Sequence, residues 1–175
     1  ELKLKGSVPA AQAATTPGHT ISGPDALDSD DVLGIQLERA LASLGWVPSL
    51  PDEALVGKPT KVVVDDLGKD DPKEYGLLIK YESGVKLFTS YGETDLHQRQ
   101  SGQPRSGTTD ARSVLETVAG RQTAVNNGGV ATLSRGDFEV PKTVCWNLRG
   151  YTYSMRSSSP DVSLAELKAA AASVD

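Results

Sequence analysis

Hydrophobic residues recur at helical spacing in two stretches of the chain, one toward each end. In residues 28–46 the apolar positions are Leu33, Leu37, Ala40, Leu41 and Leu44. In residues 163–174 they are Leu164, Leu167, Ala171 and Val174. Spacing of three and four residues places such side chains on one side of a helix. Both stretches therefore predict amphipathic helices that bury one face.

Polar residues at the ends of these stretches are typical of helix caps. Asp28 or Ser29 can accept hydrogen bonds from the first turn of the N-terminal helix. Gly45 suits its C-terminal end, because glycine adopts the left-handed conformation without strain. Ser163 and Glu166 have the spacing of a capping box, which predicts the start of the C-terminal helix.

Between the two helices, apolar and polar residues alternate with the two-residue period of strands. Ser83-Gly84 predicts a two-residue hairpin turn, and 147–150 predicts a second hairpin. Short turns join antiparallel strands, so a parallel α/β enzyme fold is not expected. The predicted class is α+β: a curved, half-barrel-like antiparallel sheet with an N-terminal helix and a C-terminal helix packed on one face. The predicted strand regions are 60–66, 75–93, 112–127, 130–135 and the first part of 142–174.

Two segments lack any hydrophobic period. Residues 1–27 are rich in Ala, Pro, Gly, Ser and Thr, which predicts a linker or an extended arm. Residues 94–111 carry many turn-forming residues, which predicts a long loop. The remainder, 28–175, has the length of a single domain that can build a core without disulfides. The single cysteine, Cys145, alternates with strand neighbours and is expected to be a buried apolar residue.

The number and distribution of charged residues limit the classes of molecule that are expected to bind the chain. The chain has 18 Lys and Arg against 23 Asp and Glu, and its basic residues form no block along the sequence. Nucleic acid is therefore not an expected partner. No apolar run reaches the 18 residues of a membrane-spanning helix. Because the first residue is Glu1 and not Met, we expect a targeting or anchoring segment upstream.

The sequence contains no recognisable catalytic or metal-binding motif. Neither of the two histidines, His19 and His97, has a second histidine at metal-binding spacing. No nucleophile elbow, phosphate loop or dinucleotide fingerprint occurs. The acidic cluster at 28–31 lacks the glycine and the later glutamate of a calcium loop. We therefore expect no cofactor, no metal and no enzymatic activity.

The concave face of the predicted sheet is the candidate binding surface. A curved sheet crossed by a helix can leave an apolar groove. Ordinary packing of the same side chains into the core is the alternative interpretation. The aromatic candidates for this groove are Trp46, Phe88, Trp146, Tyr151 and Tyr153.

The closing stretch 142–174 carries a recognisable order of motifs: a Trp, a turn with Gly, Tyr-Thr-Tyr, a polar gap and a Ser-Leu-x-Glu-Leu helix. With "VPSLPDEALVG" and "ETVAGRQTAV", the pattern covers residues 46–174. It resembles the uncharacterised extracytoplasmic domain of bacterial anti-sigma factors and lipoproteins, which is similar to the lipoprotein-carrier superfamily. The chain departs from the pattern in the 94–111 loop and the N-terminal helix. The residues that fit are Trp146, Gly150, Tyr151, Tyr153, Ser163, Leu164, Glu166, Leu167, Ala172 and Ser173.

This resemblance implies a non-enzymatic binding or sensing domain of the cell envelope, anchored or secreted. Its ligand would be a lipid or another apolar molecule, or a protein partner, on the concave sheet. The motif residues themselves indicate a packing unit of aromatic hairpin and closing helix. Two alternatives remain open: a hydrolase that uses His97, Arg99 and Arg105 of the loop, or an interaction module that pairs through an edge strand.

Overall fold

The computed structural model describes residues 29–97, 113–133 and 136–175. The arm predicted at 1–27, the cap at Asp28 and most of the loop predicted at 94–111 lie outside these residues. The first helical segments of the described chain are the 15-residue helix α1 (Ser29–Ser43), the short helix α2 (Glu53–Val56) and a 3₁₀ turn η1 (Pro72–Glu74). A nine-residue helix, α4 (Leu164–Ala172), is the last element. The helices predicted at both ends are confirmed.

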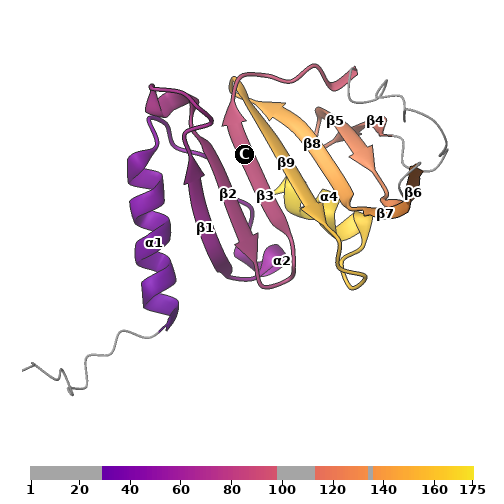
Figure 1. Cartoon of the computed structure of the whole chain (residues 1–175), viewed down its shortest axis with the longest axis horizontal. Helices are drawn as coiled ribbons and strands as arrows, with labels where there is room; N and C mark the ends of the chain where they lie inside the picture. The colour runs from indigo at the N-terminus through magenta and orange to yellow at the C-terminus, as the bar shows by residue number, and fades with distance from the viewer. Residues whose placement is uncertain (1–28, 98–112, 134–135) are drawn as a thin grey trace, which may run out of the picture.

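Seven antiparallel strands form one sheet in the order β1-β2-β3-β9-β8-β5-β4 (Figure 1). A separate antiparallel pair, β6-β7, extends from the end of this sheet. The fold is α+β, as predicted. The strands are β1 (Pro59–Asp65), β2 (Gly76–Tyr81), β3 (Lys86–Tyr91), β4 (Val114–Val118), β5 (Arg121–Asn126), β6 (Gly129–Leu133), β7 (Gly136–Val140), β8 (Lys142–Leu148) and β9 (Tyr151–Ser157).

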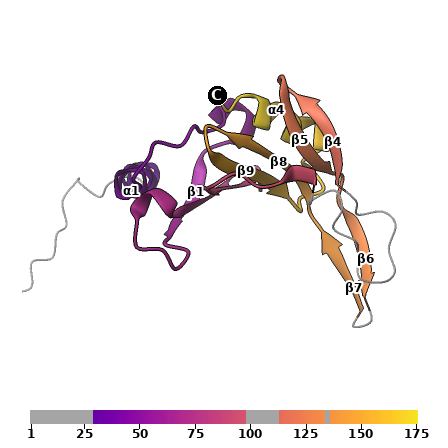
Figure 2. The same cartoon turned by 90° about the horizontal axis from the view of Figure 1, so that it is seen from above.

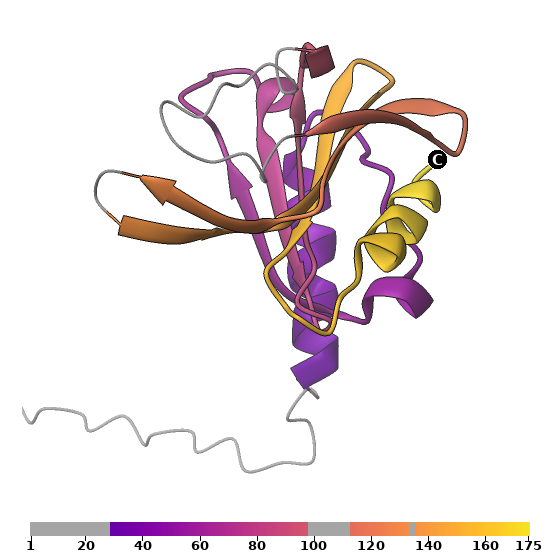
Figure 3. The same ribbon diagram turned by 90° about the vertical axis from the view of Figure 1, so that its right-hand side faces the viewer.

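The sheet curves around α4, which lies with α2 on its concave side (Figures 2 and 3). Helix α1 runs along β1 at the outer edge of the sheet, and its apolar residues reach the same core. The β6-β7 hairpin projects on the opposite, convex side (Figure 3). The sheet therefore has one face covered by helices and one face that the described helices leave open.

The main core lies between the concave face and α4. Alternation along each strand sends every second side chain to this face. Leu77 and Ile79 of β2, for example, are fully buried, whereas Leu78 between them lies on the convex side. Helix α4 contributes small residues that allow a close approach to the sheet. Its buried positions are Leu167, Ala170, Ala171 and Val174 beyond its end.

Two hairpin turns follow from glycines that adopt positive φ. Arg149 and Gly150 join β8 to β9 with φ of 54° and 85°, which confirms the predicted hairpin. Gly84 (φ 84°) closes the β2-β3 hairpin. Tyr81 donates its N–H to the carbonyl of Val85 at 2.9 Å, so this loop holds three residues. The expected two-residue turn is wrong by one residue, because the glycine ends the loop in a bulge.

The capping box at the start of α4 is present as predicted. Ser163 Oγ accepts a hydrogen bond from the Glu166 N–H at 3.2 Å, and the Glu166 carboxylate accepts one from the Ser163 N–H at 2.7 Å. The carboxylate also accepts from the Ser163 hydroxyl. These hydrogen bonds, the hydroxyl's first, lower the pKa of Glu166.

Replacing Ser163 by alanine is expected to lower the free energy of unfolding by about 1 kcal/mol at pH 7. Because the folded state lowers the pKa of Glu166, the carboxylate's contribution is present above its unfolded pKa and is lost as pH falls through the folded pKa. The difference between wild type and Ser163→Ala should therefore shrink in acid. Urea denaturation at neutral and acidic pH measures both; an equal difference at both would contradict the role of the ionised carboxylate.

Candidate functional site

Two of the predicted groove residues are core residues. Trp146 and Tyr153 are 1% and 3% exposed. They lie opposite one another on β8 and β9, and their rings stack with centroids 5.4 Å apart. Leu167 and the alanines of α4 belong to the same buried cluster. This part of the concave face is filled by the closing helix, in agreement with the packing unit predicted from the motif.

The other three candidates do not complete a groove with this pair. Trp46 and Tyr151 are half-buried and stack on each other at 4.0 Å, beyond the end of α1. Phe88 pairs with Leu78 and Ser154 in the register of β3, which places it on the convex face. The five aromatics are thus divided between the core, its rim and the opposite face of the sheet.

The loop proposed as an alternative catalytic site is only partly described. His97 donates its backbone N–H to the Asp95 carboxylate at 2.9 Å, as in a short turn. Arg99 and Arg105 lie outside the described residues. Within 29–97, 113–133 and 136–175, no three His, Cys, Asp or Glu side chains are grouped closely enough to hold a metal ion.

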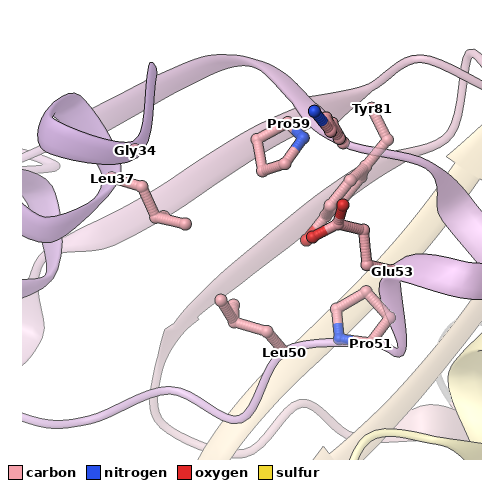
Figure 4. A pocket seen from close by; sticks show the side chains of 8 residues that line it. Gly34, Leu37, Leu50, Pro51, Glu53, Pro59 and Tyr81 are labelled. Carbon is pink, nitrogen blue, oxygen red and sulfur yellow. The ribbon is translucent and has the colours of Figure 1, made fainter. Parts of the chain in front are cut away.

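A pocket of about 290 Å³ opens between α1, α2 and the β1-β2 end of the concave face (Figure 4). We call it the α1–α2 pocket. Its walls are mainly apolar, with Glu53 at one side and Tyr81 at the base of the sheet. The residues that line it are Gly34, Leu37, Leu50, Pro51, Glu53, Lys58, Pro59 and Tyr81.

Local sequence explains why this space stays open. Gly34 carries no side chain, and a Cβ placed there would meet no atom within 4 Å. Pro51 precedes the short helix α2 and Pro59 follows it. Prolines at these positions favour an extended backbone on either side of the helix. Asp52 caps α2 by accepting from the Ala54 N–H at 2.9 Å.

The Tyr81 hydroxyl is the most unusual polar group in the pocket. The residue is 5% exposed, and its Oη has no hydrogen-bond partner among the described residues. Burial raises the pKa of Tyr81, and the nearby Glu53 carboxylate raises it further. The phenol is therefore protonated at neutral pH and can donate a hydrogen bond. A buried hydroxyl without a partner costs free energy, which a ligand carrying an acceptor would recover.

The lining of the pocket suits the binding of a small ligand. Apolar walls suit the body of a small ligand, and a few placed polar groups fix its orientation. Tyr81 offers one donor and Glu53 one carboxylate, and Figure 4 shows the two side chains extending toward each other on the same wall. Among the described residues that line the pocket there is no Ser, Cys or His that could serve as a nucleophile beside a base.

Comparisons of the chain with models of protein families, with curated proteins and with solved structures found no match. None of the helices in the described part of the chain is long and apolar enough to cross a membrane.

Proposed function

We propose that this chain is a non-enzymatic, extracytoplasmic binding or sensing domain of the bacterial cell envelope, and that its ligand occupies the α1–α2 pocket. The observation that carries the proposal is the buried Tyr81 side chain, which lines a mainly apolar pocket and whose hydroxyl has no hydrogen-bond partner among the described residues. The ligand would combine an apolar body with a carbonyl or similar acceptor. A lipid or a lipid-like molecule has this chemistry.

The position of the pocket supports a modified form of the expectation from sequence. Helix α4 covers the concave face over β8 and β9, so a ligand cannot lie there without displacing the core. The pocket lies on the same side of the sheet, where Tyr81 ends β2. The resemblance of residues 46–174 to extracytoplasmic domains of anti-sigma factors and lipoproteins supports the cellular location.

Tyr81→Phe is expected to weaken ligand binding about fivefold, because one hydrogen bond from a buried hydroxyl is worth about 1 kcal/mol. The same substitution should leave the stability of the free protein unchanged or raise it, since it removes a buried group without a partner. Nile red, a neutral dye with an apolar body and a carbonyl acceptor, is a suitable fluorescent probe. Titration of the dye and a urea denaturation curve measure the two effects.

Tyr91→Phe is the matched control for this experiment. Tyr91 is 56% exposed and does not line the pocket. Its hydroxyl should be irrelevant to dye binding. Equal dye affinities for the wild type and both variants would exclude Tyr81 as the donor. Loss of stability in Tyr81→Phe would show that the hydroxyl has a structural partner.

The proposed location is tested separately. The coding sequence upstream of Glu1 should encode a signal peptide or a membrane-spanning helix. A fusion of that upstream sequence to alkaline phosphatase should then be active outside the cytoplasm. A start codon directly before Glu1 would remove the support for an envelope protein and leave the binding pocket to be explained in another compartment.

A further inference from the structure

Four cationic residues form one row across four neighbouring strands on the convex face of the sheet. The strand register places Lys61 of β1 opposite Lys80 of β2, and Lys80 opposite Lys86 of β3. Lys86 in turn lies opposite Arg156 of β9. We call these four residues the basic row. It runs across the strands close to the end of the sheet where α1 begins (Figure 1).

This arrangement is unfavourable for the protein on its own. Neighbouring strands lie about 4.8 Å apart, so each cation in the row is directly beside another. Like charges at directly opposed positions destabilise a sheet. In the part of the chain that the structure describes, no ion pair involves any member of the row. An acidic protein that concentrates four positive charges in this way points to an anion that binds them.

The acidic residue closest in sequence to the basic row already has a hydrogen-bond partner. Glu82 follows β2, but its carboxylate accepts the backbone N–H of Lys58 at 3.0 Å, on the α2 side. Residues 98–112, outside the described part, contain three arginines and a single aspartate. Their composition therefore adds more positive charge than negative charge to the molecule.

The row ends at a polar hollow. A space of about 260 Å³ is lined by Lys86, Arg156, Ser157, Ser158 and Pro141. The β6-β7 hairpin projects on this side of the sheet, beyond β8 (Figures 2 and 3). The guanidinium of Arg156, the ammonium of Lys86 and the exposed Ser158 hydroxyl are groups that bind carboxylates or phosphates. The hollow can receive the end of a chain that lies along the row.

We propose that the basic row binds an extended acidic segment of a partner protein. Side chains on one side of an extended peptide repeat at about 6.7 Å, so three carboxylates at alternate positions span about 13 Å. Four strands span about 14 Å between the outer two, so the lengths agree. The row thus offers a cation to each carboxylate of a segment with acidic residues at alternate positions.

The geometry disfavours the two other polyanions that a basic surface can bind. A flat membrane would meet the projecting β6-β7 hairpin before the row, and no large apolar side chain of the row's strands is exposed beside it. Single-stranded nucleic acid needs aromatic platforms for its bases. Phe88, the aromatic next to Lys86 on this face, is half-buried.

The test uses the full chain and a fluorescein-labelled peptide with three alternating carboxylates, Glu-Ser-Glu-Ser-Glu. Lys86→Glu should weaken peptide binding at least tenfold, because it places a carboxylate at the centre of the row. Arg39→Glu is the matched control: it makes the same change in net charge on the exposed side of α1. It should alter affinity less than twofold. Wild-type affinity should fall steeply with added salt.

Misfolding cannot explain the expected loss, because Lys86→Glu should raise the melting temperature. The new carboxylate would lie opposite both Lys80 and Arg156. Equal weakening by Lys86→Glu and Arg39→Glu would overturn the proposal, as would equal binding of a Gln-Ser peptide. Tighter binding to phosphatidylglycerol vesicles or to a thymidine oligonucleotide than to the acidic peptide would also overturn it. The row lies on the face opposite the α1–α2 pocket, so none of these results depends on the function proposed for that pocket.

Discussion

Trp146→Ala is expected to lower the free energy of unfolding by about 3–5 kcal/mol. The side chain is 1% exposed and stacks on Tyr153, with the Arg121 guanidinium 5.7 Å from its ring. Truncation would leave a cavity beneath α4 that the small alanines of that helix cannot fill. Urea denaturation followed by circular dichroism measures the change. A loss of this size would identify Trp146 as a core residue rather than a ligand-binding one.

Trp146→Phe distinguishes the contribution of side-chain packing from that of hydrogen bonding to stability at this position. The indole Nε1 has no hydrogen-bond partner among the described residues, so replacing the indole by a phenyl ring removes no favourable bond. The stack on Tyr153 can remain. We therefore expect Trp146→Phe to cost clearly less than Trp146→Ala. Tyr91→Ala, at an exposed site, should stay within about 0.5 kcal/mol. Equal losses for Phe and Ala would contradict a packing role.

Local patterns in the sequence predicted the elements that depend on local physics. Helical spacing predicted α1 and α4, and the pair Ser163 and Glu166 predicted the capping box that the structure contains. Glycine positions predicted the hairpins at Gly84 and Gly150. The exact loop length around Gly84 was wrong, because the same residue can close a two-residue turn or a bulged three-residue loop.

Features that depend on the order and register of the strands could not be predicted from local sequence patterns. Alternation shows that Phe88 and Leu87 point to opposite faces, but not which face α4 covers. The order β3-β9-β8-β5 brings together segments that are distant in sequence. Strand β7 was not predicted, since its "GDFEV" begins with two turn-forming residues.

The basic row shows the same limit for the candidate sites. Lys61 and Arg156 are far apart in sequence, and the basic residues looked scattered along the chain. Only the register of four strands aligns them with Lys80 and Lys86. The α1–α2 pocket likewise depends on how α1 packs on β1, which no local motif encodes. Gly34 was the one local indication of this pocket, because a glycine inside a helical pattern usually has a packing or functional reason.

Arg121 is a second residue whose role only the tertiary structure reveals. It begins β5, directly after the Ala119-Gly120 turn, and reaches across to the C-terminal end of α4. Its guanidinium donates to the carbonyls of Ala171 (2.9 Å), Ala172 (3.4 Å) and Val174. These carbonyls belong to the end of a helix, where no further turn supplies donors. The positive charge also lies at the negative end of the helix dipole.

Arg121→Met is therefore expected to lower the free energy of unfolding by about 2 kcal/mol, because it keeps the stem but removes a charged group with several hydrogen bonds. Arg121→Lys should recover part of the loss, since lysine keeps the charge but cannot span several carbonyls with one planar fork. Urea denaturation gives the total effect, with Arg39→Met as an exposed control.

Hydrogen exchange then locates the effect of Arg121→Met. The amides of Ser173 and Val174, which bond within the last turn, should exchange faster than those of β2 and β3. If exchange rises uniformly over the whole chain instead, Arg121 stabilises the fold through its contact with Trp146 and not through the end of α4. If Arg121→Lys matches the wild type, the charge near the dipole suffices and the forked hydrogen bonds add nothing.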